Sequence, residues 1–173
     1  MTVDFSRVPP FYHNYIGLVK EENLMNAFHE HQKSVVKILK ILPEEKWNYR
    51  YEQNKWTIKD MVQHLIDAER IFCYRALRFS RKDKTELPGF DENTFALSAE
   101  AHRRTGKDLI EELSTVQHSS AQLFASFSSD QLSQSGIANG KSVYVEAIGF
   151  IIIGHALHHL KILRERYGLD KDS

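Results

Sequence analysis

The sequence has one cysteine and no excess of charge of either sign. A single thiol, Cys73, excludes an intrachain disulfide framework and suits a reducing compartment. The 23 Lys and Arg residues balance 23 Asp and Glu residues, whereas proteins that bind nucleic acids usually carry a basic excess. The sequence therefore argues against a nucleic acid as partner.

Long apolar runs and export signals are also missing from the sequence. No apolar run approaches the length of a membrane span, and the first residues, MTVDFSR, lack the basic and apolar regions of a signal peptide. We therefore expect a cytoplasmic protein that does not enter a membrane. With 42% hydrophobic residues, the chain can bury a sizeable core, and we expect residues 1–173 to form a single domain.

Apolar positions recur with helical spacing along most of the chain, and no strand pattern of useful length is present. The pattern predicts four helices, over about residues 21–42, 57–80, 98–127 and 143–167. Thr57 and Asp60 have the spacing of a capping box at the start of the second helix. Ser98 can cap the third helix, and Gly168 can end the fourth. We expect the polar residues 129–141 to form a loop.

The link between the second and third helices, residues 81–97, is long for neighbouring antiparallel helices. Fully extended, it spans up to about 56 Å, whereas a 24-residue helix is about 36 Å long. The link can therefore cross the whole bundle, which makes the second and third helices parallel and the second and fourth antiparallel. The predicted fold is all-α, a four-helix bundle with a long crossover between helices two and three.

Three histidines meet in this arrangement. His155 and His159 lie one turn apart on the fourth helix, so both imidazoles leave the same face. In the crossover topology His64 of the second helix lies at nearly the same height. Three imidazoles can hold one divalent ion, zinc or nickel, and leave a coordination position open for water or substrate. The sequence therefore predicts a metal site.

Other side chains could also belong to the set of metal ligands, so the sequence does not fix that set. His158 follows His155 by three residues and could also face the ion, and His31 could form a fourth wall of the site. A fourth protein ligand would indicate a structural site, since structural zinc is usually closed by four. Asp67 could orient the His64 imidazole or be a solvated surface carboxylate. No Glu follows His155 and no Glu-x-x-His occurs, which argues against a zinc-protease helix and a di-iron bundle.

Three short segments resemble the DinB/YfiT-like family in their order and spacing. They are KWTIKD (55–60) leading into HLIDAER (64–70), then LPGFD (87–91), and finally GHALHH (154–159). The resemblance implies a four-helix bundle with this crossover, dimers, and a nickel or zinc ion on His64, His155 and His159. Some similar proteins transfer low-molecular-weight thiols such as bacillithiol or mycothiol to electrophiles, and others are described as metal-dependent hydrolases.

We therefore expect a metal-dependent enzyme for a small-molecule substrate, a thiol S-transferase, and a homodimer. The alternatives are a metal-dependent hydrolase and a non-catalytic metal-binding or interaction module. Metal coordination deprotonates a thiol without a general base, whereas hydrolysis would call for a carboxylate such as Asp67 or Glu69. Phe90 and Phe95 are the expected apolar walls of a pocket under the crossover link.

Overall fold

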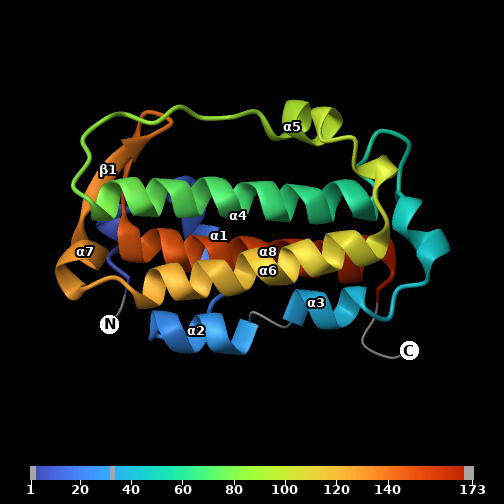
Figure 1. Cartoon of the computed structure of the whole chain (residues 1–173), viewed down its shortest axis with the longest axis horizontal. Coiled ribbons are helices and arrows are strands. Elements are labelled where there is room, and N and C mark those ends of the chain that lie inside the picture. Colours follow the sequence, from blue (N-terminus) through green and yellow to red (C-terminus); the bar gives the residue numbers. More distant parts are fainter. Residues whose placement is uncertain (1–2, 32–33, 170–173) are drawn as a thin grey trace.

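The structure is a computed structural model, and it describes residues 3–31 and 34–169. Long helices lie side by side and run the length of the molecule (Figure 1). The helices are α1 (His13–Ile16), α2 (Leu24–His31), α3 (Ser34–Leu39), α4 (Ile58–Ser80), α5 (Glu92–Ser98), α6 (Gly106–Ala125), α7 (Ser129–Ser133) and α8 (Val145–Tyr167). The strands are β1 (Ser135–Ala138) and β2 (Lys141–Tyr144), and short 3-10 turns are η1 (Phe5–Arg7), η2 (Pro10–Tyr12), η3 (Glu44–Asn48) and η4 (Ala101–Arg103).

Helices α4 and α8, which carry the three histidines, confirm the sequence-based boundaries. The Thr57 side chain accepts a hydrogen bond from the Asp60 backbone N–H at 3.1 Å, and the Asp60 carboxylate accepts one from the Thr57 backbone N–H at 2.9 Å. This capping box satisfies two backbone donors at the start of α4. Helix α8 ends at Gly168, whose φ of 67° is in the left-handed region that glycine adopts readily.

The crossover between the second and third long helices is confirmed. In Figure 1 the colour gradient runs the same way along α4 and α6 and the opposite way along α8, and the segment after α4 returns along the outside of the bundle. The contacts agree, since Gln63 of α4 meets Arg104 before α6 while Cys73 further along α4 meets Ser120 further along α6. The four-helix bundle therefore has the predicted directions.

Two of the predicted helices differ from the observed ones. In place of one helix over residues 21–42, α2 and α3 follow each other along one edge of the bundle, and residues 32–33 lie outside the described part. The prediction that Ser98 caps a helix over residues 98–127 is wrong, because Ser98 ends α5 and Thr105 caps α6 in a capping box with Asp108. Gly106 opens α6 where a Cβ would lie 2.2 Å from the Trp47 ring.

Residues 129–141 form more than the predicted loop. Strands β1 and β2 pair in an antiparallel hairpin, whose turn residues Asn139 and Gly140 both have positive φ, 52° and 69°. Leu87 of the crossing segment joins this hairpin, because its N–H donates to Ile137 O and its carbonyl accepts from the Asn139 N–H, both at 2.9 Å. The hairpin therefore anchors the crossing segment at one end of the bundle.

Helix α8 corrects one further prediction, that no apolar segment approaches the length of a membrane span. The helix has 23 residues, and its most apolar 18-residue stretch, with a mean hydropathy of 1.3, makes it long and apolar enough to cross a membrane by length and composition. The other helices bury 67% of its most apolar stretch. This is the pattern of a helix in the centre of a bundle, apolar on all its sides.

Candidate metal centre

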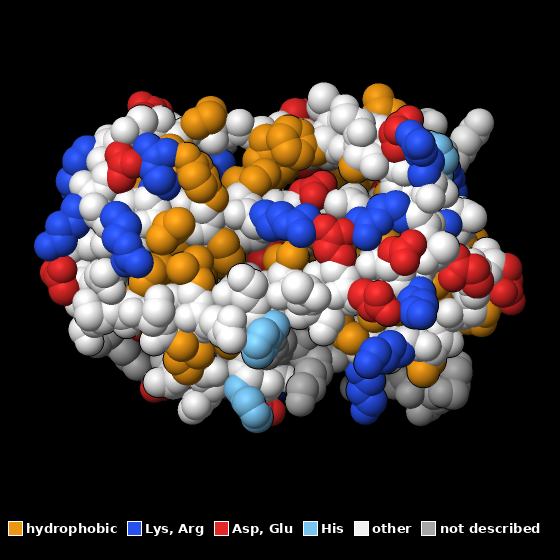
Figure 2. All heavy atoms as spheres, viewed as in Figure 1, with side chains coloured by type: hydrophobic (Ala, Val, Ile, Leu, Met, Phe, Trp, Pro, Cys, Tyr) orange, Lys and Arg blue, Asp and Glu red, His pale blue; other side chains and the backbone are white. Residues whose placement is uncertain are grey.

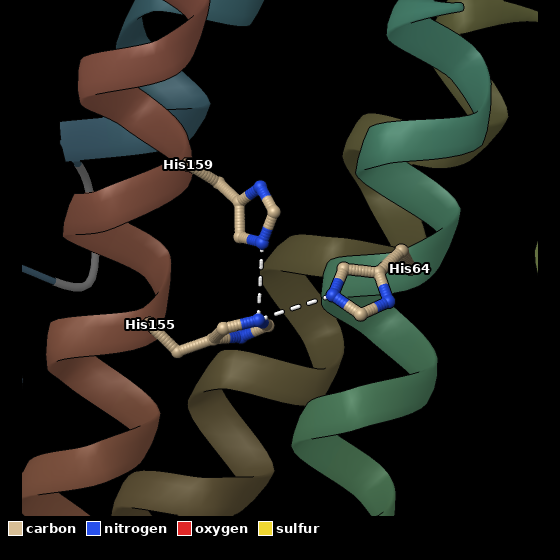
Figure 3. Close-up of side chains that lie close together, drawn as sticks. All are labelled: His64, His155 and His159. Atoms are coloured by element: carbon tan, nitrogen blue, oxygen red, sulfur yellow. Dashed lines mark hydrogen bonds between the residues drawn. The ribbon is translucent and has the colours of Figure 1, made fainter. Parts of the chain in front are cut away.

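The structure brings the three histidines together. His64 projects from α4 toward His155 and His159 of α8, and all three rings point to one spot between the helices (Figure 3). The Nε2 atoms of His64 and His155 are 3.1 Å apart, and so are those of His159 and His155. Each side chain is buried, with 8–9% of its surface exposed.

The arrangement of the imidazole nitrogens fits a divalent cation. A neutral imidazole nitrogen either carries one N–H or offers one lone pair. The Nε2 of His155 can therefore form a good hydrogen bond to His64 or to His159, but not to both. Zinc–nitrogen bonds are about 2.0–2.1 Å long, so tetrahedral ligand atoms are roughly 3.3 Å apart. The observed 3.1 Å separations are close to that spacing.

Burial keeps these imidazoles neutral. It lowers the pKa of His64 to about 4 and that of His159 to about 3. Burial also holds the pKa of His155 well below its ordinary value of 6.5, and the neighbouring His159, His64 and His158 add to this effect. Neutral imidazoles have the free lone pairs that metal ligation requires. Near neutral pH the site is therefore ready to bind a cation without first losing protons.

A cavity of about 290 Å³ opens beside the three histidines. Its aromatic walls come from four parts of the chain: Phe11, Tyr12, Tyr15, Trp56, Phe72 and Phe90. Its charged side chains are Arg75 of α4 and Glu92 at the start of α5. Its volume is at the lower end of the range for small-molecule sites.

Glu92 is a candidate functional residue that the sequence reasoning missed. It lies on α5, after the crossing segment, and the negative charge of its carboxylate acts on the pKa values of His64 and Tyr15. The available signal was the position of Glu92 directly after the LPGFD segment. Spacing on α4 could not reveal it, because only the crossover brings α5 over this part of the bundle.

The carboxylates expected to assist hydrolysis lie elsewhere, and that expectation is wrong. Asp67 accepts a hydrogen bond from Gln63 at 2.9 Å and lines a separate hollow with Arg104. Glu69 is 5% exposed and faces a different cavity, which it shares with Gln117. Neither residue is among those that line the cavity beside the three histidines.

Neither candidate fourth histidine completes the ligand set. The Nε2 of His31 is hydrogen-bonded to a carboxylate oxygen of Glu21, at 2.7 Å, and His31 faces the cavity of Glu69. His158 is half-buried in the wall of the metal-site cavity, with its ring 5.1 Å from that of Tyr15. Within the described ranges, the group of side chains whose ligand atoms lie within 4.8 Å of one another comprises His64, His155 and His159.

The two expected aromatic walls take different positions. Phe90 lines the cavity as predicted. Phe95 is 44% exposed, packs against Phe90 with ring centroids 4.9 Å apart, and lines the neighbouring hollow. Phe95 therefore supports the wall from outside, which corrects its predicted role.

Helix α1 forms another wall because Gly154 has no side chain. A Cβ at this position of α8 would lie 2.0 Å from the backbone oxygen of Tyr15. This close approach brings the Tyr15 ring to 5.5 Å from that of His155. The glycine before the first histidine of α8 therefore sets how closely α1 covers the site.

Comparison with known proteins identifies the family. A family model described as the DinB superfamily matches residues 27–163, so the chain belongs to the DinB superfamily. No curated protein matches the chain. Among solved structures, YfiT from Bacillus subtilis, described as "a probable metal-dependent hydrolase with an unusual four-helix bundle topology", is similar with a TM-score of 0.70. The two chains are 15% identical over 84% of this chain and 86% of YfiT, and the similarity shows the shared fold.

Proposed function

We propose that this member of the DinB superfamily is a divalent-metal-dependent enzyme that acts on a small molecule in the cavity beside the three histidines. One observation carries the proposal: three buried, neutral imidazoles converge at the wall of a cavity of about 290 Å³. Three protein ligands leave a coordination position for a reactant, whereas a structural zinc site is usually closed by four. We propose zinc or nickel as the ion, since both suit imidazole ligands.

The reaction that we propose first is the transfer of a low-molecular-weight thiol to an electrophile. When bound, the ion would lower the pKa of a thiol in the open position, so the thiol needs no separate base. The chain's own residues then orient the reactants. Trp56 and Phe72 flank the histidines with apolar surface, and Phe90 covers the cavity from the crossing segment. These aromatic rings suit an apolar electrophile and exclude water.

Hydrolysis is the second candidate, and Glu92 is the observation that favours it. A carboxylate in the cavity can accept a proton from water during attack on an ester or amide. The description of YfiT as a metal-dependent hydrolase also agrees with this reaction. A non-catalytic module whose metal only joins α4 to α8 remains the third reading. We further propose a cytoplasmic homodimer, and light scattering of the purified protein measures the dimer.

Metal content tests the site itself. Elemental analysis of protein purified without an affinity tag is expected to find about one zinc or nickel ion per chain. The His155→Ala/His159→Ala variant should lose the ion, whereas His118→Ala, an exposed control on α6, should retain it. Equal, sub-stoichiometric metal in all three proteins would contradict the proposed site.

An assay pair separates the reactions. Metal-loaded protein is given a small electrophile with and without a low-molecular-weight thiol, and separately a panel of activated esters and amides. Thiol-dependent conjugation is the expected result. Turnover of esters without thiol, and its loss in Glu92→Gln, would establish hydrolysis instead. Inactivity in both assays would favour the non-catalytic module.

A further inference from the structure

Arg75 is a buried cation in the wall of the metal-site cavity. It lies on α4, and only 5% of its surface is exposed. Its Nη2 donates a hydrogen bond to the backbone oxygen of Pro88 at 3.0 Å. The hydroxyl of Tyr12 is a further hydrogen-bond partner, and burial raises the pKa of Tyr12, so this partner is neutral.

The guanidinium of Arg75 has no ionic partner within the described ranges, residues 3–31 and 34–169. More exposed arginines of the chain do have one, since Arg70 and Arg104 both pair with Glu112. In Figure 2 basic and acidic side chains alternate across the middle of the face formed by α4 and α6. Two more exposed arginines of the chain, Arg70 and Arg104, are therefore paired with a carboxylate, whereas the buried guanidinium of Arg75 is not.

A buried, unpaired guanidinium calls for an anion. Arginine stays protonated in proteins, so it cannot become neutral when it is buried. The carbonyl of Pro88 and the hydroxyl of Tyr12 satisfy hydrogen bonds but do not balance the charge. The carboxylate of Glu92 also lines the cavity, but its charge acts on His64 and Tyr15. A ligand in the cavity is left to supply the negative charge.

The position of Arg75 relative to the histidines limits the size of this ligand. The Phe72 ring lies 6.1 Å from the His155 ring and 5.9 Å from the Cζ of Arg75. The guanidinium is therefore within about 12 Å of that imidazole. Side chains on a helix lean toward its N-terminus, which directs Arg75 back toward His64. A single small molecule can reach both positions along the face of Phe72.

We propose that Arg75 binds a carboxylate of the substrate, whose reacting atom lies at the three histidines. The planar guanidinium matches a carboxylate in bidentate geometry. The substrate is then a small anionic molecule, with an apolar segment against Phe72 between its carboxylate and its reacting atom. The inference rests on the proposed function for the place of the reacting atom, but the carboxylate site itself is independent of the metal.

Calorimetric binding of simple ligands tests the inference. The probes are ω-mercaptocarboxylates of increasing chain length, their ω-mercaptoamides and the thiol-free analogues of both, each offered to zinc-loaded and to metal-free protein. We expect wild type to bind the best-fitting carboxylate about 10- to 100-fold more tightly than the amide of the same length. In Arg75→Gln this ratio should fall to about one, and Arg75→Lys should keep part of it. Arg81→Gln, at the exposed end of the same helix, should keep all of it.

The same probes separate this inference from the proposed function. If wild type binds carboxylate and amide equally, and the thiol raises the affinity only when zinc is bound, the role of Arg75 is overturned and the metal site is supported. If wild type prefers the carboxylate but neither zinc nor the thiol raises the affinity, the role of Arg75 is supported and the proposed function is overturned. The wild-type comparison needs no variant, so an Arg75 variant that fails to fold leaves the test intact.

Discussion

Glu69 allows a quantitative prediction about the stability of the bundle. Its carboxyl group is buried between α4 and α6, and the cavity beside it has a volume of about 20 Å³. That volume holds about one water molecule, too few to hydrate a carboxylate. Burial therefore raises the pKa of Glu69 from 4.5 to about 7, although a hydrogen bond from Ser120 partly opposes the effect.

The sign and size of the effect follow from proton linkage. Between pH 4.5 and 7 the unfolded chain has an ionised Glu69, whereas the folded protein keeps it protonated. Folding then binds a proton, so the stability present below pH 4.5 is lost progressively as the pH rises to about 7. The full loss amounts to about 3 kcal/mol of the free energy of unfolding. Glu69→Gln keeps the shape of the side chain and removes this loss.

Urea denaturation between pH 5 and pH 8, with a chelator present, measures the effect. The free energy of unfolding of Glu69→Gln minus that of wild type should increase by about 2–3 kcal/mol over this range. The three histidines titrate in the same way in both proteins, so their contribution cancels in the difference. A difference that stays constant with pH would show that Glu69 ionises normally in the folded protein, and would refute the argument from burial.

Three further predictions concern the metal centre and the helices that build it. Metal-free protein should lose stability as the pH falls from 6.5 toward 4, because the lowered pKa values of His64 and His159 make the folded state resist protonation. Thermal melts at several pH values measure this loss, and an unchanged melting temperature would contradict the prediction. Gly154→Ala should destabilise the protein by about 1–3 kcal/mol, since a Cβ 2.0 Å from the Tyr15 backbone oxygen forces α1 away. Denaturant titration measures this loss of stability, and a Gly154→Ala variant as stable as wild type would contradict the prediction. Thr57→Ala should cost about 1 kcal/mol through loss of the α4 cap, whereas a smaller change than in the exposed Thr115→Ala control would argue against the cap.

Local signals explain which parts of the fold the sequence could predict. The Thr57 capping box and Gly168 act through nearby backbone groups, so the ends of α4 and α8 were predictable from short stretches of sequence. The start of α6 was missed because both Ser98 and Thr105 are possible caps, and the choice depends on how Trp47 packs against Gly106. Strands of four residues leave little periodicity, although the Asn-Gly turn was a usable hairpin signal.

In the candidate site, too, local spacing predicted some residues, whereas residues that depend on packing were missed. Helical spacing was enough to put His155 and His159 on one face, and chain directions were enough to bring His64 beside them. The same spacing rotates Asp67 by roughly 60° and Glu69 by roughly 140° away from His64 around α4. The packing of α1 and the crossing segment decides which face of α4 lines the cavity. The periodicity of the α4 sequence does not predict that packing.

The crossover links the two halves of the candidate site. It makes α4 antiparallel to α8, which places His64 level with His155 rather than at the far end of the bundle. The segment that performs the crossing then runs over the same cavity, where it supplies the Pro88 carbonyl to Arg75 and the ring of Phe90 to the wall. The hairpin bond between Leu87 and Asn139 fixes that segment just before these residues. One topological feature thus positions both the metal-binding imidazoles and the groups that would hold a substrate, so a change in the crossing segment should alter substrate binding while leaving the three histidines in place.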